Sequence, residues 1–151
     1  MLRLLKIIPS LILVFLIYNL MVLDFKDHNN INFETENYIN GLTEFFNEGI
    51  GFKVNLPSQM AFQITRGDSL LILGLLLLFF EICKSTSASN LSIAEHVFSI
   101  LLFILFIFEF LSYGYAGTSL FMKLALLSFI DAIAGIVITI TAARRDVSIR
   151  R

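Results

Sequence analysis

Four long apolar segments follow one another along the chain and limit its fold more than any other feature. They cover residues 7–23, 68–84, 91–113 and 116–143. A helix needs about 20 mostly apolar residues to cross the roughly 30 Å hydrocarbon core of a bilayer. The second segment reaches that length only if Asp68 and Lys84 at its ends are included. We therefore predict a single polytopic domain, an all-α membrane protein with four transmembrane helices.

The composition favours lipid over water around these segments. Of the 151 residues, 57% are hydrophobic and 15% are charged, and the mean hydropathy is +0.83. An ordinary soluble domain carries about 25% charged residues. A soluble domain of this size leaves much of its surface exposed, so it could bury so apolar a chain only incompletely.

The residues present also argue against several classes of function. Cys83 is the only cysteine, which excludes an intramolecular disulfide and a cysteine-based metal cluster. His96 follows Glu95 without a second histidine four residues away, so we expect no metal and no cofactor. The net charge of −1 does not bear on nucleic acid, but no basic patch interleaved with aromatic residues is present, so we expect no nucleic-acid partner. Since no Ser-His-Asp set and no phosphate-binding glycine loop is present, we predict that the chain is not an enzyme.

The first apolar segment has two interpretations. Arg3 and Lys6 precede it and could form the basic region of a signal peptide. The stretch "YNLMVLDFK" at its end offers no cleavage site of small residues. We therefore expect a retained membrane helix.

Basic residues near the segment ends predict the orientation, because cytoplasmic loops are enriched in Lys and Arg. If the chain crosses four times, most of them fall on one side: Arg3, Lys6, Lys84, Arg144, Arg145, Arg150 and Arg151. The other side holds Lys26, Lys53 and Arg66, together with all four tyrosines, whose amphipathic rings suit the headgroup layer. We predict that both termini are cytoplasmic.

Residues 24–67, between the first two predicted spans, form an extracytoplasmic segment with structure of its own. In "ETENYINGLTEFFNEG", Tyr38, Leu42 and Phe45 make an apolar stripe at helical spacing, which predicts an amphipathic helix. In "GFKVNLPSQMAFQITRGD", apolar and polar residues alternate on both sides of Pro57-Ser58, which predicts a short β-hairpin. We interpret the Arg-Gly-Asp that ends it as a turn in which Asp68 caps the next helix, rather than as an adhesion motif.

Charged residues inside the predicted spans form two groups by depth. Glu81, Lys84, Glu95 and His96 lie near the cytoplasmic ends of the second and third spans, where Glu81 and Lys84 are spaced to pair and a structural role is expected. In the outer half, Glu109, Lys123 and Asn19 are predicted at similar depth. Pairing of Glu109 with Lys123 is the simplest account, and extension of Lys123 to the outer headgroups is the alternative.

Asp131 lies deeper, near the middle of the fourth span. It borders a seam of small residues, which lets another helix approach closely in lipid. The seam comprises Ala125, Ser128, Ala132, Gly135, Thr139 and Ala142. Asp131 is therefore expected to face a protein contact, and with Lys123, Glu109 and Asn19 it makes the candidate intramembrane polar cluster.

These features leave two functions open. In the first, the chain is a non-catalytic accessory or scaffolding component of a plasma-membrane complex. Asp131 then bonds across a helix contact, within the bundle, to a membrane-protein partner or to a second copy. In the second, Asp131, Lys123 and Glu109 line a proton or solute pathway in a small oligomeric transporter. We favour the first, because internal repeats and broken helices with paired Gly or Pro are lacking.

Three stretches carry a resemblance to known proteins. They are "LPSQMAFQITRGDSLLILGLLLLFFEICK", "HVFSILLFILFIFEF" and "DAIAGIVITITAARRDV". They resemble a group of small four-helix inner-membrane proteins of alphaproteobacteria, described as transmembrane proteins of unknown function. The resemblance implies a multi-pass topology in a bacterial inner membrane and carries no catalytic motif.

Overall fold

The computed structural model describes residues 8–29, 36–85 and 90–149. The elements in chain order are α2 (Ile12–Asn29), α3 (Glu36–Asn47), β1 (Gly49–Asn55), β2 (Ala61–Thr65), α4 (Arg66–Ser85), α5 (Asn90–Ser112), the 3₁₀ helix η1 (Gly114–Ala116) and α6 (Ser119–Ile149). The predicted mostly helical fold is confirmed.

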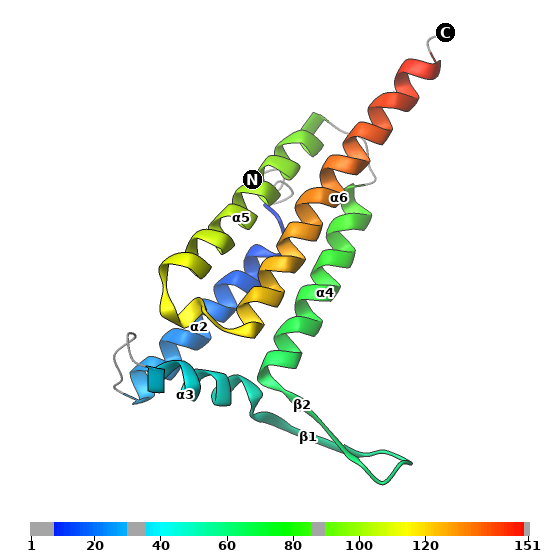
Figure 1. Cartoon of the computed structure of the whole chain (residues 1–151). Coiled ribbons are helices and arrows are strands. Elements are labelled where there is room, and N and C mark those ends of the chain that lie inside the picture. The colour runs from blue at the N-terminus through cyan, green and yellow to red at the C-terminus, as the bar shows by residue number, and fades with distance from the viewer. Residues whose placement is uncertain (1–7, 30–35, 86–89, 150–151) are drawn as a thin grey trace.

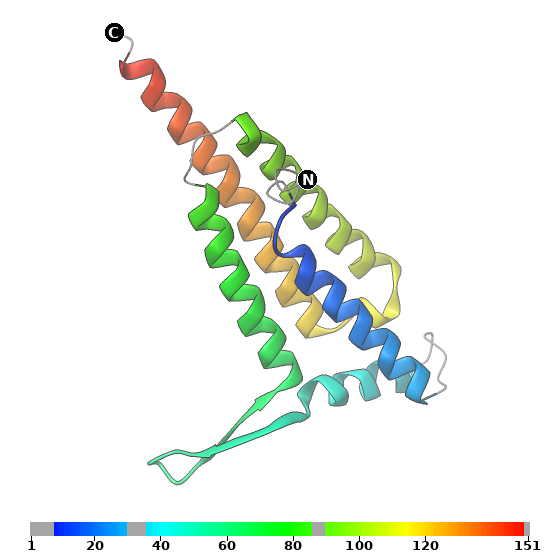
Figure 2. The ribbon, with the colours of Figure 1, turned by 180° about the vertical axis from the view of Figure 1, so that it is seen from behind.

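Helices α2, α4, α5 and α6 run alongside one another as a bundle, and α6 packs against both α4 and α5 (Figure 1). Helix α3 lies across one end of the bundle, and the β1–β2 hairpin projects sideways from that end (Figures 1 and 2). The first turn of α2 and the last turns of α6 lie at the opposite end. Helix α3 and the hairpin, residues 36–65, therefore form a platform at this end of the bundle.

Among the described residues, two helices are long and apolar enough to cross a membrane. They are the parts of α5 and α6 that cover Ala94–Ser112 and Ser119–Thr141. Helix α2 continues past Leu23 through Asp24, Lys26 and Asp27, and α4 carries charged residues near both ends. Two of the four predicted spans therefore meet the criterion of length and hydropathy.

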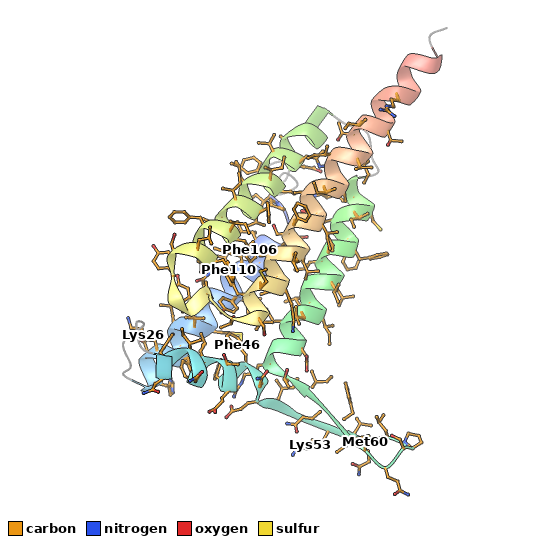
Figure 3. All side chains as sticks on the ribbon, viewed as in Figure 1. Lys26, Phe46, Lys53, Met60, Phe106 and Phe110 are labelled. Atoms are coloured by element: carbon orange, nitrogen blue, oxygen red, sulfur yellow. The ribbon has the colours of Figure 1, made fainter. Side chains whose placement is uncertain are left out.

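The surface of the bundle is apolar on all four long helices. Large hydrophobic side chains are exposed on each of them, among them Leu16 and Leu20 of α2, Phe79 and Phe80 of α4, Ile104 and Phe108 of α5, and Ile133 and Val137 of α6. Figure 3 shows side chains extending outward along the whole bundle. Ionisable side chains are instead buried between the helices: Glu81, Glu95, His96, Glu109 and Asp131.

The predicted amphipathic helix and hairpin are both present. Tyr38, Leu42 and Phe46 of α3 are buried against the bundle, and the Phe46 ring stacks on Tyr18 of α2 at a centroid distance of 5.1 Å. In the hairpin, Val54 pairs with Phe62 in an antiparallel ladder. The turn between the strands contains Pro57-Ser58, as predicted.

The start of α4 shows how the chain passes from the hairpin into the bundle. The Thr65 hydroxyl accepts a hydrogen bond from the Asp68 backbone N–H at 3.0 Å, and the Asp68 carboxylate accepts one from the Thr65 N–H at 3.1 Å. This reciprocal pair is a capping box, which satisfies N–H groups that a helix start leaves open. The capping residue is therefore Thr65 and not Asp68, and Arg66-Gly67-Asp68 forms the first turn of α4 instead of the predicted turn before it.

Candidate functional site

Asp131 lies in a polar cluster that four segments of the chain build together. We call this set the Asp131 cluster: Ser10, Glu81, Lys84, Glu95, His96, Ser99 and Asp131. Asp131 is 4% exposed, and the Ser99 hydroxyl of α5 hydrogen-bonds to its carboxylate. Glu81 and Lys84 lie within electrostatic range of it. Its Oδ2 atom has no hydrogen-bond partner among the residues that the structure describes.

Glu81 joins α4 to residues that lie far from it in the sequence. Its Oε1 atom pairs with Lys84 Nζ at 2.6 Å, which confirms the predicted pair. Its Oε2 atom accepts hydrogen bonds from the Ser10 hydroxyl at 2.7 Å and from the Ser10 N–H at 3.1 Å. Lys84 Nζ also lies 3.9 Å from Glu95 Oε2 on α5. One carboxylate and one ammonium thus connect α4 with α5 and with the residues preceding α2.

His96 occupies the contact between α5 and α6. Its side chain is 7% exposed, and a Cβ atom added at Gly135 would lie 2.2 Å from its Nδ1 atom. Only glycine at position 135 leaves room for the imidazole. Within the described ranges, no three His, Cys, Asp or Glu side chains gather in a way that could hold a metal ion.

The small-residue seam of α6 faces the inside of the bundle over most of its length. Ala125, Ser128, Ala132 and Gly135 are buried, and Thr139 is half-buried. The Ala142 side chain lies outside the described residues. Ser128 Oγ, like Asp131 Oδ2, has no hydrogen-bond partner in the described part of the chain.

A second group surrounds Glu109 at the platform end. We call it the Glu109 cluster: Tyr18, Asn19, Glu109, Tyr115 and Thr118. Glu109 is 6% exposed, and its Oε2 atom accepts a hydrogen bond from Asn19 Nδ2 at 3.4 Å. The Tyr115 side chain also hydrogen-bonds to this carboxylate. Oε1 has no hydrogen-bond partner among the described residues.

Tyr18 joins α2 to the start of α6. Its hydroxyl donates to the Tyr115 carbonyl at 2.9 Å and lies 2.9 Å from Thr118 Oγ1. Thr118 Oγ1 also accepts the Phe121 N–H at 3.2 Å and so caps α6. Burial, together with the charge of Glu109, raises the pKa of Tyr115 to about 12. Tyr115 therefore acts as a neutral hydrogen-bonding group at ordinary pH.

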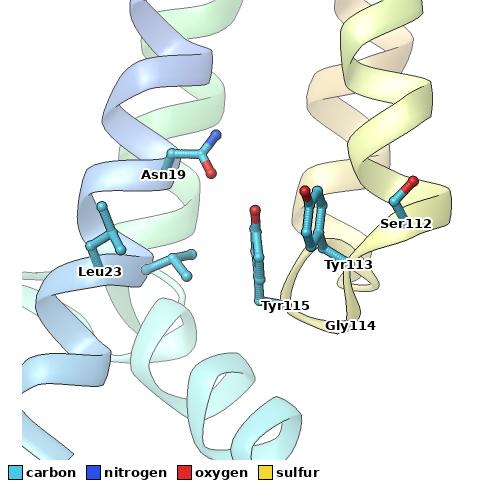
Figure 4. Close-up of a pocket in the computed structure, with 7 residues that line it drawn as sticks. Asn19, Leu23, Ser112, Tyr113, Gly114 and Tyr115 are labelled. Carbon is cyan, nitrogen blue, oxygen red and sulfur yellow. The ribbon is translucent and has the colours of Figure 1, made fainter. Parts of the chain in front are cut away.

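A cavity of about 530 Å³ opens beside the Glu109 cluster. Asn19 and Leu23 line it from α2, and Ser112, Tyr113 and Tyr115 line it from the α5–α6 connection (Figure 4). Its wall is mixed, with aromatic rings beside an amide and a hydroxyl.

The four residues of the candidate intramembrane cluster do not lie together. Asn19 and Glu109 are brought together, whereas Asp131 lies in the other cluster. Lys123 is exposed and lies within electrostatic range of Asp68 at the start of α4. Among the described residues no ion pair joins Lys123 to Glu109.

An aromatic layer separates the two clusters. The Phe15 and Phe106 ring centroids lie 4.8 Å apart, and those of Phe106 and Phe121 lie 5.3 Å apart. All three residues belong to the buried core. On α5, Phe106 lies between Ser99 and Glu109, so it stands between the two clusters along the helix.

Sequence reasoning missed Ser10 and Ser99 of the Asp131 cluster, and it did not assign Tyr18, Tyr115 or Thr118 to the Glu109 cluster. The two serines show why. Lone serines in apolar segments are common, and nothing local marks these two. Ser99 could have been found by depth, because α5 and α6 are antiparallel neighbours and Ser99 and Asp131 are similarly far from the connection between them.

Comparisons with protein families, with curated proteins and with solved structures found no match for this chain. The function is therefore argued from the geometry of the clusters and of the bundle surface.

Proposed function

We propose that the chain is a non-catalytic polytopic membrane protein, in which α2, α4, α5 and α6 all cross the bilayer. The observation that carries this proposal is the distribution of side chains in the bundle. Large apolar residues are exposed on all four helices, while four carboxyl side chains and one imidazole of the described residues are buried between them. In water this arrangement would be unfavourable on both counts, whereas lipid stabilises it.

Helices α2 and α4 fit this proposal despite their charged residues. Glu81 and Lys84 of α4 pair with each other inside the bundle, so neither needs to face acyl chains. The charged residues of α2 follow Leu23 and lie at the platform end, where Asp24 is exposed. Both helices can therefore present their apolar faces to lipid.

We further propose that the platform is extracytoplasmic and that both ends of the chain face the cytoplasm. Lys84 and Arg144 belong to the end of the bundle opposite the platform, in keeping with the enrichment of basic residues on the cytoplasmic side. The resemblance to small inner-membrane proteins favours a bacterial inner membrane.

An accessory or scaffolding role accounts best for the two clusters. Each cluster joins helices that are distant in sequence, and the aromatic layer fills the bundle between them. Buried polar contacts of this kind fix which helix faces which. The apolar outer surface remains available to lipid and to a membrane-protein partner or a second copy.

A proton or solute pathway is the second candidate, and one observation favours it. Asp131 Oδ2, Ser128 Oγ and Glu109 Oε1 are buried without hydrogen-bond partners in the described structure. Buried oxygens of this kind call for a proton, water or an incoming group. Because Lys123 is exposed, it takes no part in this pathway, and the aromatic layer would have to open.

Purification of the tagged full chain from native membranes in mild detergent tests the accessory role. We expect a defined membrane protein or a second copy to co-purify with the chain. The same partner should co-purify with the control variant Glu44→Gln, because Glu44 is exposed on α3. Recovery of the chain as a lone monomer would contradict the proposal.

Proteoliposomes separate the two candidates. We expect the wild-type chain to leave an imposed pH gradient intact. Dissipation of the gradient by the wild type, abolished by Asp131→Asn and by Glu109→Gln, would favour the pathway.

Labelling from outside intact spheroplasts tests the topology. In a Cys83→Ser background, Ser58→Cys in the hairpin turn should react with a membrane-impermeant maleimide, while Arg144→Cys should react only after lysis. The reverse pattern would contradict the proposed orientation.

A further inference from the structure

The hairpin separates apolar and polar side chains onto two faces. Val54 lies directly opposite Phe62 in the ladder, and Lys53 lies directly opposite Gln63. Because successive side chains in a strand point to opposite faces, these two pairs lie on different faces. Leu56 and Met60 are two residues from Val54 and Phe62 and are joined by a backbone hydrogen bond of 2.9 Å, so they continue the apolar face.

Nothing in the described structure covers this apolar face. Its exposed fractions are 38% for Val54, 42% for Leu56, 70% for Met60 and 49% for Phe62. An isolated two-stranded hairpin is only marginally stable in water and needs a packed hydrophobic face. A contiguous exposed apolar patch usually marks an interaction surface. The hairpin therefore requires an occupant for this face.

The position of the hairpin indicates which occupant fits. It projects sideways from the platform end of the bundle, across the direction of the long helices (Figures 1 and 2). In Figure 3, Met60 and Lys53 extend to opposite sides of the hairpin, and Met60 lies on the side along which the helices run. The apolar face is thus turned toward the space beside the exposed apolar residues of α4.

We propose that the apolar face of the hairpin, formed by Val54, Leu56, Met60 and Phe62, inserts into the outer leaflet at the boundary between headgroups and acyl chains. This inference rests on the proposed membrane location of the bundle. Lys53, Asn55 and Gln63 then face the aqueous side. The backbone stays at the headgroup level, because open strand edges are excluded from the hydrocarbon region. The hairpin would lie in the membrane interface as an interfacial amphipathic helix does, with two strands in place of the helix.

The absence of tryptophan from the sequence allows a direct test. Single tryptophans are introduced by Phe62→Trp and Met60→Trp on the apolar face, and by Gln63→Trp on the polar face as the matched control. Ile104→Trp, on the exposed surface of α5, marks the bilayer depth of the bundle. Each variant is reconstituted into phosphatidylcholine vesicles, with and without lipids brominated near the headgroup end of the chains.

We expect brominated lipid to reduce the fluorescence of Phe62→Trp and Met60→Trp, and iodide in the buffer to reduce that of Gln63→Trp. Iodide quenching of all three hairpin variants alike would overturn the inference. Quenching of Phe62→Trp by neither agent would also overturn it, because the face would then be covered by protein. If lipids brominated deeper in the chains quench Ile104→Trp while the hairpin variants stay unquenched by any lipid, only the hairpin inference fails. If Ile104→Trp is also unquenched, the proposed membrane bundle fails with it.

Discussion

The two ends of the bundle are held together by different chemistry. At the Asp131 cluster, an ion pair between Glu81 and Lys84 and the hydrogen bonds of Ser10 join helices through charged groups. At the Glu109 cluster, Tyr18 bonds to a backbone carbonyl and to the Thr118 hydroxyl, and stacked rings fasten the platform. A charged group buried without its partner destabilises a fold far more than an unpaired hydroxyl does. The end that holds the Asp131 cluster should therefore be the more sensitive to substitution.

Glu81→Ala should have the largest effect. It leaves Lys84 without its closest carboxylate, removes the side-chain acceptor of the Ser10 N–H, and leaves the Ser10 hydroxyl only the longer bond to the Leu77 carbonyl. We expect a loss of about 3 kcal/mol, the lower end of the range for breaking a buried pair, because Lys84 is partly exposed. Unfolding in SDS-containing mixed micelles measures it, with Glu44→Ala on the exposed face of α3 as control. Equal stability of the two variants would contradict the role given to Glu81.

Gly135→Ala should come next, again at the Asp131 cluster. The added methyl group would meet the His96 ring at 2.2 Å. We expect overpacking to lower the free energy of unfolding by about 3 kcal/mol and the better helix propensity of Ala to restore about 1 kcal/mol. The net loss of stability is about 2 kcal/mol.

The double variant Gly135→Ala with His96→Ala tests that cause. It should recover much of the loss, because the two positions are coupled through one contact. Gly74→Ala is the matched control, since its nearest neighbour is the end of the flexible Leu127 side chain at 2.9 Å. A Gly74 variant as unstable as the Gly135 variant would show that the imidazole is not the cause.

Tyr18→Phe tests the other end of the comparison. It removes the hydroxyl that bridges the Tyr115 carbonyl and Thr118 while keeping the ring. We expect a loss of about 1 kcal/mol, the net value of a typical hydrogen bond. Tyr113→Phe, at an exposed position, should change the same unfolding transition little. A loss as large as that of Glu81→Ala would break the contrast between the two ends.

The platform should also show a pH dependence. Burial raises the pKa of Tyr38 from 10.0 to about 12. The folded state therefore keeps the phenol proton at pH values where the unfolded state releases it, so stability should fall as the pH rises from 10.0 to about 12. Tyr38→Phe should flatten the slope of unfolding free energy against pH in this range. An unchanged slope would assign the pH dependence to other groups.

Much of the fold could be predicted from the sequence, because its signals are local. The period of Tyr38, Leu42 and their neighbours and the alternation around Pro57-Ser58 each depend on a few adjacent residues. The ends of the helices could be predicted less accurately. Helix α2 continues to Asn29 and α6 to Ile149, since hydropathy marks where apolar residues stop and not where backbone hydrogen bonds stop.

The grouping of the buried polar residues was predicted only in part, because depth along a helix does not fix its rotation. Glu109 and Lys123 are similarly far from the connection between α5 and α6, but Glu109 faces inward and Lys123 faces outward. Asn19 contacts Glu109 because both side chains lie on faces that point into the bundle. The partners of Asp131 come from other helices, and which helix stands beside it is decided by packing of the whole bundle.

The contacts of α2 also bear on the order of assembly. Its residues are made before those of α4, α5 and α6, yet Ser10 bonds to Glu81, Asn19 to Glu109, and Tyr18 to Tyr115 and Thr118. Every one of these partners follows α2 in the sequence by about fifty residues or more. Helix α2 therefore reaches its final contacts only after α4, α5 and the start of α6 have been made. Until then its polar groups lack these partners, and in this interval the nascent chain most needs a chaperone or an insertase.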